Sequence, residues 1–239
     1  MDNPGIFQLL GFGPQGWGPA LLIGAAMTVA LAVSGFVIGG CLGSLAAWGK
    51  ISGGRIARWA ADIYTTVLRG IPDLLVIYLF YFGGSRAVSG IGHLFGYQGF
   101  IGLPGFLAGA LAIGMVSGAQ QAEVFRGAYS AVSRGEIEAA VAVGMNHWTR
   151  FRRIIAPLVI RYALPGLGNV WQVVLKESAL ISVTGVVELL RQSQIAAGST
   201  RQPFTFYFAA AVLYLAITTV SSLSFFKAEG RFSRGMRRS

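Results

Sequence analysis

One carboxylate, that of Glu177, lies in a stretch where a charge is costly. Residues 160–180 are mostly apolar, yet Lys176 and Glu177 stand side by side near their end and Ser178 follows. Charges in hydrocarbon usually face a pathway or a partner. Neighbouring helical residues point in different directions, so Lys176 cannot simply neutralise Glu177. Two interpretations stay open. Glu177, with Ser178 beside it, meets the ammonium or guanidinium group of a substrate, or it forms a buried ion pair with another helix.

Two further pairs of charges interrupt or end apolar segments. Arg69 and Asp73 are spaced i,i+4, and Glu123 and Arg126 are spaced i,i+3. On a continuous helix either spacing allows the two side chains to neutralise each other, which is the structural interpretation of both pairs. The functional interpretation places Arg69 and Glu123 along the same substrate pathway as Glu177.

The composition indicates whether these charges lie in water or in a membrane. Hydrophobic residues make up 54% of the 239 residues and charged residues only 12%, and the mean hydropathy is +0.62. Soluble domains carry about 25% charged residues, so the chain is expected to lie in a membrane. The net charge of +10 does not indicate nucleic-acid binding, because the basic residues lie between apolar stretches. The single cysteine, Cys41, excludes an intrachain disulfide and is expected to fill a small space in the core.

Five segments are long and apolar enough to cross a bilayer, which requires about 20 mostly apolar residues. They are residues 19–49, 59–82, 99–122, 160–180 and 203–226. Pro72, in the sequence RGIPD, is expected to kink or restart the second helix. Residues 182–200 stay open between a periplasmic amphipathic helix and a partial re-entrant segment. The sequence therefore predicts an all-α membrane protein with five transmembrane helices.

The positions of Lys and Arg predict which side of the membrane each loop occupies. One side carries Lys50, Arg55, Arg58, Arg126, Arg134, Arg150, Arg152, Arg153, Arg161, Lys227, Arg231, Arg234, Arg237 and Arg238, and the other carries only Arg86, Arg191 and Arg201. Cytoplasmic loops carry the basic excess. We therefore expect a periplasmic N-terminal segment (1–18), a transmembrane domain (19–226) and a basic cytoplasmic tail (227–239).

The cytoplasmic loop at residues 133–157 has the signals of two short helices. Ser133 followed three residues later by Glu136 is the pattern of a capping box, which starts a helix. Gly144 allows a sharp turn, and Asn146 is a suitable cap for a second short helix ending near Pro157. The pattern alone is equally typical of an ordinary amphipathic helix on the membrane surface.

The same loop resembles the EAA loop of the inner-membrane permeases of ABC importers. That pattern, E-A-A-x3-G-x9-I-x-L-P, is matched here by Glu138, Ala139, Ala140, Gly144, Ile154 and Pro157, with Ala156 in place of the usual Leu. The sequences LRGIPDLLVIYLFYFGG (68–84) and AEVFRGAYSAV (122–132) are similar to the polar amino-acid subfamily. Residues 161–200 resemble the permeases for histidine, lysine, arginine and ornithine and their octopine- and nopaline-transporting relatives. The resemblance covers nearly all of the chain after about residue 18.

This resemblance implies a type I ABC importer permease fold, in which the loop is a helix–turn–helix that couples the permease to a separate cytoplasmic ATPase. It implies ATPase subunits that bind ATP and Mg, a second permease subunit forming a heterodimer, and a periplasmic substrate-binding protein. The chain itself would need no cofactor. The substrate would be a polar, basic amino acid or an opine. The protein would lie in the bacterial inner membrane.

Enzymatic activity in the chain itself is not expected. The sequence GSLAAWGKIS (43–52) fails as a phosphate-binding loop, because five residues separate its glycines and Ile51 stands where Ser or Thr must bind magnesium. His93 and His147, the two histidines, lie on opposite predicted sides of the membrane, so no metal site is expected. The alternative function is an ion-coupled carrier, which is expected to have inverted repeats with broken helices in both halves. No such symmetry is evident.

Overall fold

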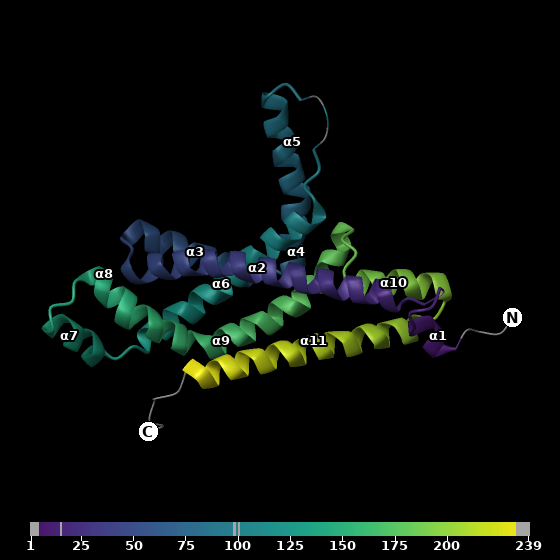
Figure 1. The fold of residues 1–239 in the computed structure, drawn as a ribbon. Coiled ribbons are helices and arrows are strands. Elements are labelled where there is room, and N and C mark those ends of the chain that lie inside the picture. Colours follow the sequence, from purple (N-terminus) through teal and green to yellow (C-terminus); the bar gives the residue numbers. More distant parts are fainter. Residues whose placement is uncertain (1–4, 15, 98, 100, 233–239) are drawn as a thin grey trace.

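The computed structural model describes residues 5–14, 16–97, 99 and 101–232, which form helices and no strands (Figure 1). The predicted all-α class is confirmed. The helices are α1 (Ile6–Leu10), α2 (Gly18–Ser52), α3 (Arg55–Gly70), α4 (Asp73–Tyr78), α5 (Gly84–Leu94), α6 (Gly105–Ser130), α7 (Arg134–Ala142), α8 (His147–Arg150), α9 (Ala156–Glu177), α10 (Leu189–Thr200) and α11 (Pro203–Phe232). Two π-helical turns, η1 (Leu79–Gly83) and η2 (Phe151–Ile155), and one 3-10 turn, η3 (Ser178–Thr184), join some of them. Residues 1–4 of the predicted periplasmic segment and residues 233–239 of the predicted tail lie outside the described residues.

Four helical stretches are long and apolar enough to cross a membrane: Gly18–Ser52, Asp73–Leu94, His147–Thr184 and Pro203–Phe232. They contain three of the predicted spans, residues 19–49, 160–180 and 203–226. The predicted span at 99–122 corresponds to α6, which begins only at Gly105 and is not among the four. Helix α6 is long enough but less apolar, since it carries Gln120 and Gln121. These polar side chains are compatible with a membrane because other helices cover much of α6, and Gln121 is fully buried.

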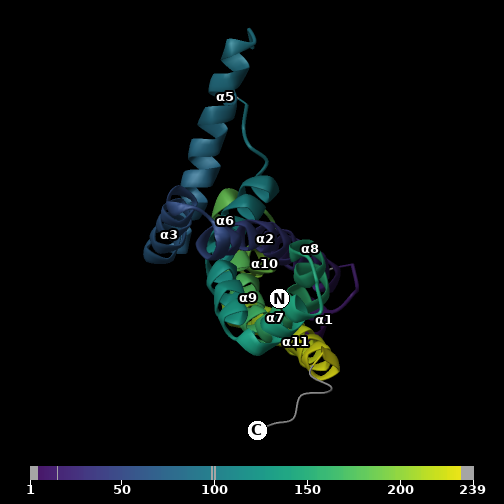
Figure 2. The ribbon, with the colours of Figure 1, turned by 90° about the vertical axis from the view of Figure 1, so that its left-hand side faces the viewer.

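The predicted second span, residues 59–82, is not one continuous helix. Helix α3 ends at Gly70, Ile71 is extended, and α4 begins at Asp73 after Pro72. The expectation that Pro72 restarts the helix is therefore confirmed. From Asp73 the chain continues through η1 into α5, and both views show α5 projecting away from the bundle of longer helices (Figures 1 and 2).

Helices α2 and α6 pack closely at the centre of the bundle because glycines line their contact. Gly35, Gly39 and Gly43 recur at every fourth residue of α2 and face Gly114 and Gly118 of α6. A Cβ on Gly43 would lie 2.9 Å from the Gly118 carbonyl oxygen. Small residues at such spacing let membrane helices approach closely. The adjoining core consists of Leu31, Val76, Ile77, Ile113, Val116, Val170, Trp171, Val174, Leu175 and Ile181.

Residues 182–200, whose path the sequence left open, end η3 and form α10. Gly185, with φ of +84°, closes η3, and α10 then packs through Leu189 and Ala196 into a second apolar cluster with Leu21 and Phe206. The expected core position of Cys41 is wrong, because its side chain is exposed on α2. A membrane-spanning helix is apolar on its lipid-facing surface as well as in the core. The apolar sequence around Cys41 therefore did not reveal whether its side chain is buried.

Candidate functional site

The first helix of the loop at residues 133–157 has the start and the end that its sequence predicts. Ser133 and Glu136 form a capping box, in which the Ser133 N–H donates to Glu136 Oε2 at 3.2 Å. After α7, Gly144 adopts a left-handed φ of +78°. The Gly144 N–H donates to the Val141 carbonyl at 2.9 Å, and the Met145 N–H donates to the Ala140 carbonyl at 3.1 Å. This pair of bonds is a Schellman motif, which terminates α7 and fixes the turn.

The second part of the loop begins as predicted but does not end as predicted. Asn146 caps α8, since its Oδ1 accepts from the Thr149 N–H at 2.8 Å. The short helix was expected to end near Pro157, and this expectation is wrong. The chain stays helical through η2 into α9, where Pro157 lies in the first turn. Proline lacks an N–H and crowds the carbonyl of the preceding turn. The wider π-helical turn before it accommodates that loss without a break.

Most residues matching the EAA pattern lie at the surface of the loop. Glu138, Ala139, Gly144 and Pro157 are exposed, Ile154 is half-buried, and Ala140 is buried. Large apolar side chains are also exposed on this loop: Val141, Val143, Trp148 and Phe151. The Trp148 and Phe151 rings stack with centroids 6.1 Å apart, although the Trp148 side chain is 69% exposed. An apolar patch of this kind on a rigid turn is typical of a surface that binds a partner.

Glu177 is buried at the end of α9, where two polar side chains from other helices face it. It is 7% exposed. The side chains of Asp73, at the start of α4, and Gln120, on α6, are the neighbours of its carboxyl group. Neighbouring carboxyl groups disfavour each other's ionised form, and a cation beside them relieves this repulsion. Ser178 is buried beside it, but its hydroxyl donates to the Leu175 carbonyl at 2.7 Å.

The predicted pairing of Arg69 with Asp73 does not form. Because the helix stops at Gly70, the two residues do not share a helix face, and Arg69 is exposed. The three ion pairs found among the described residues involve neither Asp73 nor Glu177. A structural ion pair for Glu177 within the described part of this chain therefore has no support.

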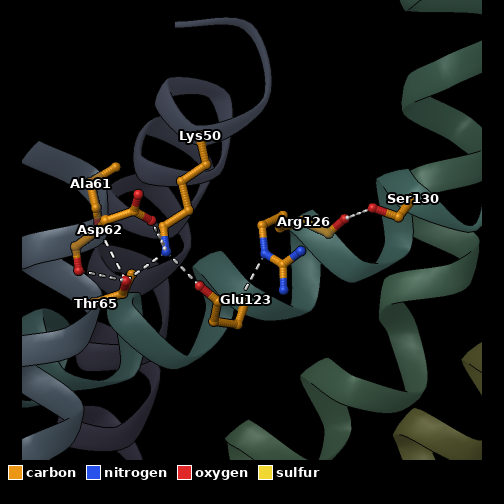
Figure 3. A network of polar contacts seen from close by, with 7 residues as sticks. All are labelled: Lys50, Ala61, Asp62, Thr65, Glu123, Arg126 and Ser130. Atoms are coloured by element: carbon orange, nitrogen blue, oxygen red, sulfur yellow. Dashed lines mark hydrogen bonds and ion pairs between the residues drawn. The ribbon is translucent and has the colours of Figure 1, made fainter. Parts of the chain in front are cut away.

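Glu123 lies elsewhere, in a network near the end of α2 (Figure 3). Its Oε2 accepts from Arg126 Nε at 2.8 Å, as the i,i+3 spacing predicts, and its Oε1 accepts from Lys50 Nζ at 2.6 Å. Lys50 and Glu123 are 73 positions apart, so this contact follows from the fold and not from local spacing. The charge of Glu123 is fully engaged within the chain.

Sequence reasoning missed one buried carboxylate, that of Glu188. Its side chain caps α10 by accepting from the Leu190 and Arg191 N–H groups at 2.8 and 2.7 Å. The Tyr214 hydroxyl donates to it at 3.2 Å and the Thr28 hydroxyl lies at 3.5 Å. Burial raises the pKa of this carboxyl above its ordinary value, and the four donors oppose that rise. A lone acid between Ser178 and Leu190, an otherwise uncharged stretch, was the signal available in the sequence.

Comparison with known proteins assigns this helical bundle to a family. Residues 39–234 match the family described as "binding-protein-dependent transport system inner membrane component". The match covers most of the chain, so the chain belongs to this family.

Individual relatives agree over nearly their full lengths. The octopine transport system permease protein of Rhizobium meliloti is 59% identical over 237 residues, which is 98% of this chain and 99% of the relative. The histidine/lysine/arginine/ornithine transport system permease protein of Escherichia coli (strain K12) is 40% identical, with 93% of this chain and 97% of the relative covered. Among solved structures, an amino acid ABC transporter crystallised with histidines superposes with a TM-score of 0.76, at 34% identity over 90% of this chain and 95% of that chain. The fold is thus that of an ABC importer permease.

Proposed function

We propose that this chain is the permease subunit of an ATP-driven importer for basic amino acids or opines. The observation that carries this substrate class is the buried carboxyl group of Glu177 beside the half-buried one of Asp73, for which the described residues supply no ion-pair partner. An ammonium or guanidinium group would neutralise the pair while it passes. The names of the relatives, which include octopine, histidine, lysine and arginine, support the same class. Ser178 follows Glu177 directly and stays in the proposed pathway, whereas Glu123, which is paired with Lys50 and Arg126, and Arg69, which is exposed, are left out of it.

We further propose five spans with a periplasmic N-terminus and a cytoplasmic C-terminus. Helix α6 is the remaining span, and its polar side chains are acceptable because it lies inside the bundle. The second crossing runs from α3 past the break at Pro72 into the apolar stretch Asp73–Leu94. The excess of Lys and Arg near the loop at residues 133–157 and around the end of α11 supports the orientation.

The loop from α7 to η2 is, in this proposal, the coupling element that seats in a separate cytoplasmic ATPase subunit. The apolar Val141 and Trp148 would fill the contact, and Glu138 would fix its register through charge. The ATPase subunit would bind ATP and Mg, and this chain would hold no cofactor. A second permease subunit, in a heterodimer, and a periplasmic substrate-binding protein would complete the complex in the bacterial inner membrane.

The test is co-expression with the ATPase and second permease candidates, followed by purification and reconstitution into vesicles. We expect the ATPase to co-purify, and its ATP hydrolysis to rise when binding protein loaded with arginine, lysine or octopine is added. Loading with glutamate is the matched control and should produce no rise. Uptake driven by an ion gradient without ATP would contradict the proposal and favour an ion-coupled carrier.

A further inference from the structure

At the end of α2, the ammonium group of Lys50 lies between two other helices (Figure 3). Its Nζ donates to Thr65 Oγ1 at 2.7 Å and to Glu123 Oε1 at 2.6 Å, and it lies 3.0 Å from Asp62 Oδ1. An ammonium group has three N–H donors, so these three contacts saturate it. One atom therefore joins α2 to α3, which carries Asp62 and Thr65, and to α6, which carries Glu123.

The two central members of this network are partly buried and the two outer ones are exposed. The side chains of Lys50 and Glu123 are 9% and 23% exposed, whereas those of Asp62 and Arg126 are 56% and 49% exposed. Exposed ion pairs contribute little. The main ionic contact between α2 and α6 is therefore the Lys50–Glu123 pair, and the Lys50–Thr65 hydrogen bond adds α3 to it.

This pair lies on the route from the loop at residues 133–157 into the bundle. Helix α6 ends at Ser130 and α7 begins at Arg134, so three residues separate them. Glu123 lies seven positions before Ser130, which is about 10 Å of helix. Figure 3 shows Arg126 and Ser130 continuing along α6 away from the pair, with the Ser130 hydroxyl bonded to the Arg126 carbonyl at 3.1 Å.

The packing between α2 and α6 explains why a charged contact is needed there. Toward the middle of the bundle the two helices meet through glycines, which have no side chains to interlock. Ser117 and Gln121 of α6 hydrogen-bond across these faces to the Gly35 and Phe36 carbonyls, but beyond Gly43 the glycine contact with α6 ends, since Gly49 meets Ala57 of α3. There the Lys50 ammonium group, held by acceptors on both α3 and α6, restrains the register of α2 against them.

We propose that Lys50 and Glu123 are positioning residues that carry movement of the coupling loop through α6 into the α2–α3 hairpin. This inference rests on the proposed function of the chain as an importer permease. Without the pair, α7 and the end of α6 would follow the ATPase while α2 and α3 lag behind. ATP hydrolysis would then continue with less substrate imported per ATP.

The test uses the reconstituted complex and measures substrate imported per ATP hydrolysed. The variants are Lys50→Met, Glu123→Gln and the double variant Lys50→Met/Glu123→Gln. Each single variant leaves the remaining charge of the Lys50–Glu123 contact with only its exposed partner, Arg126 for Glu123 and Asp62 for Lys50, so it should assemble less well for structural reasons alone. The double variant leaves no buried charge and should assemble like the wild type. We expect it to hydrolyse ATP while its import per ATP falls by at least about fivefold, the lower end of typical coupling between sites.

The matched control is Asp62→Asn/Arg126→Gln, which removes the two exposed charges and keeps the buried pair. This control variant should import as much substrate per ATP hydrolysed as the wild type. A double variant Lys50→Met/Glu123→Gln with the wild-type ratio would overturn the inference, and so would its failure to assemble, which would make the pair a structural support only. Import by the wild-type complex in the same vesicles would support the proposed function even if the double variant overturned this inference. No wild-type import would instead overturn the proposed function, and the inference with it.

Discussion

Gly39 of α2 and Gly118 of α6 lie backbone against backbone at the centre of the bundle. A Cβ on Gly39 would lie 3.0 Å from the Gly118 nitrogen, and a Cβ on Gly118 would lie 3.2 Å from the Gly39 carbonyl oxygen. This close approach also lets Gln121 of α6 reach across, where its Nε2 donates to the Phe36 carbonyl at 3.1 Å. Helix α6 is thereby held against α2 from Gly114 to Gln121.

The first prediction concerns this contact. Gly118→Ala should lower the free energy of unfolding by about 1–3 kcal/mol, because the added methyl group overpacks the α2–α6 contact. Gly127→Ala is the matched control on the same helix, since a Cβ there meets nothing within 4 Å. Thermal unfolding in detergent measures both. Equal stability of the two variants would show that the glycine contact is loose.

The turn at Gly144 gives the second prediction. A Cβ there meets nothing within 4 Å, so any cost of a substitution comes from the φ of +78°. Gly144→Ala should destabilise the turn by about 1–2 kcal/mol and weaken co-purification of the ATPase, and Gly144→Asn should do so less. Gly135→Ala, within α7, is the control and should leave co-purification unchanged. Full ATPase recovery with Gly144→Ala would argue against a rigid coupling loop.

Glu188 gives a third prediction, on stability. Glu188→Ala removes the cap of α10 and leaves the part-buried N–H groups of Leu190 and Arg191 without this acceptor, which costs about 0.5–2 kcal/mol. Glu188→Gln keeps one acceptor oxygen and should fall between Glu188→Ala and the wild type. Protease resistance of the α10 region in detergent provides the measurement. If both variants resist proteolysis like the wild type, the carboxylate does not support α10.

The fourth prediction concerns topology. A reporter active only in the cytoplasm should be active when fused after Ser239, and one active only in the periplasm should be active when inserted near Gly90. The reason is the excess of Lys and Arg on the loop and tail side. The opposite pattern of activity would exclude the five-span orientation.

Features of the fold that depend on neighbouring residues were predictable from the sequence, and features that depend on distant ones were not. The start of α7 at Ser133, the turn at Gly144 and the cap at Asn146 follow from local backbone chemistry. The partner of Asp73 was mispredicted because Pro72 ends the helix that Arg69 would have shared. Lys50 could not be paired with Glu123, since 73 positions separate them. Glu188 was missed because glutamate is not among the preferred helix-capping residues.

The central claim is that Glu177 serves a cationic substrate, and uptake by the Glu177→Gln variant tests it most directly. Radiolabelled arginine uptake is measured in vesicles containing the assembled complex, with loaded binding protein outside and ATP inside. Glutamine keeps the shape and removes the charge. Uptake should fall at least about tenfold, because a hydrogen bond to a charged group contributes about 1.5–3 kcal/mol. Assembly and basal ATP hydrolysis should persist, and the exposed neighbour variant Lys176→Gln should transport normally. Wild-type uptake by Glu177→Gln with normal assembly would contradict the claim.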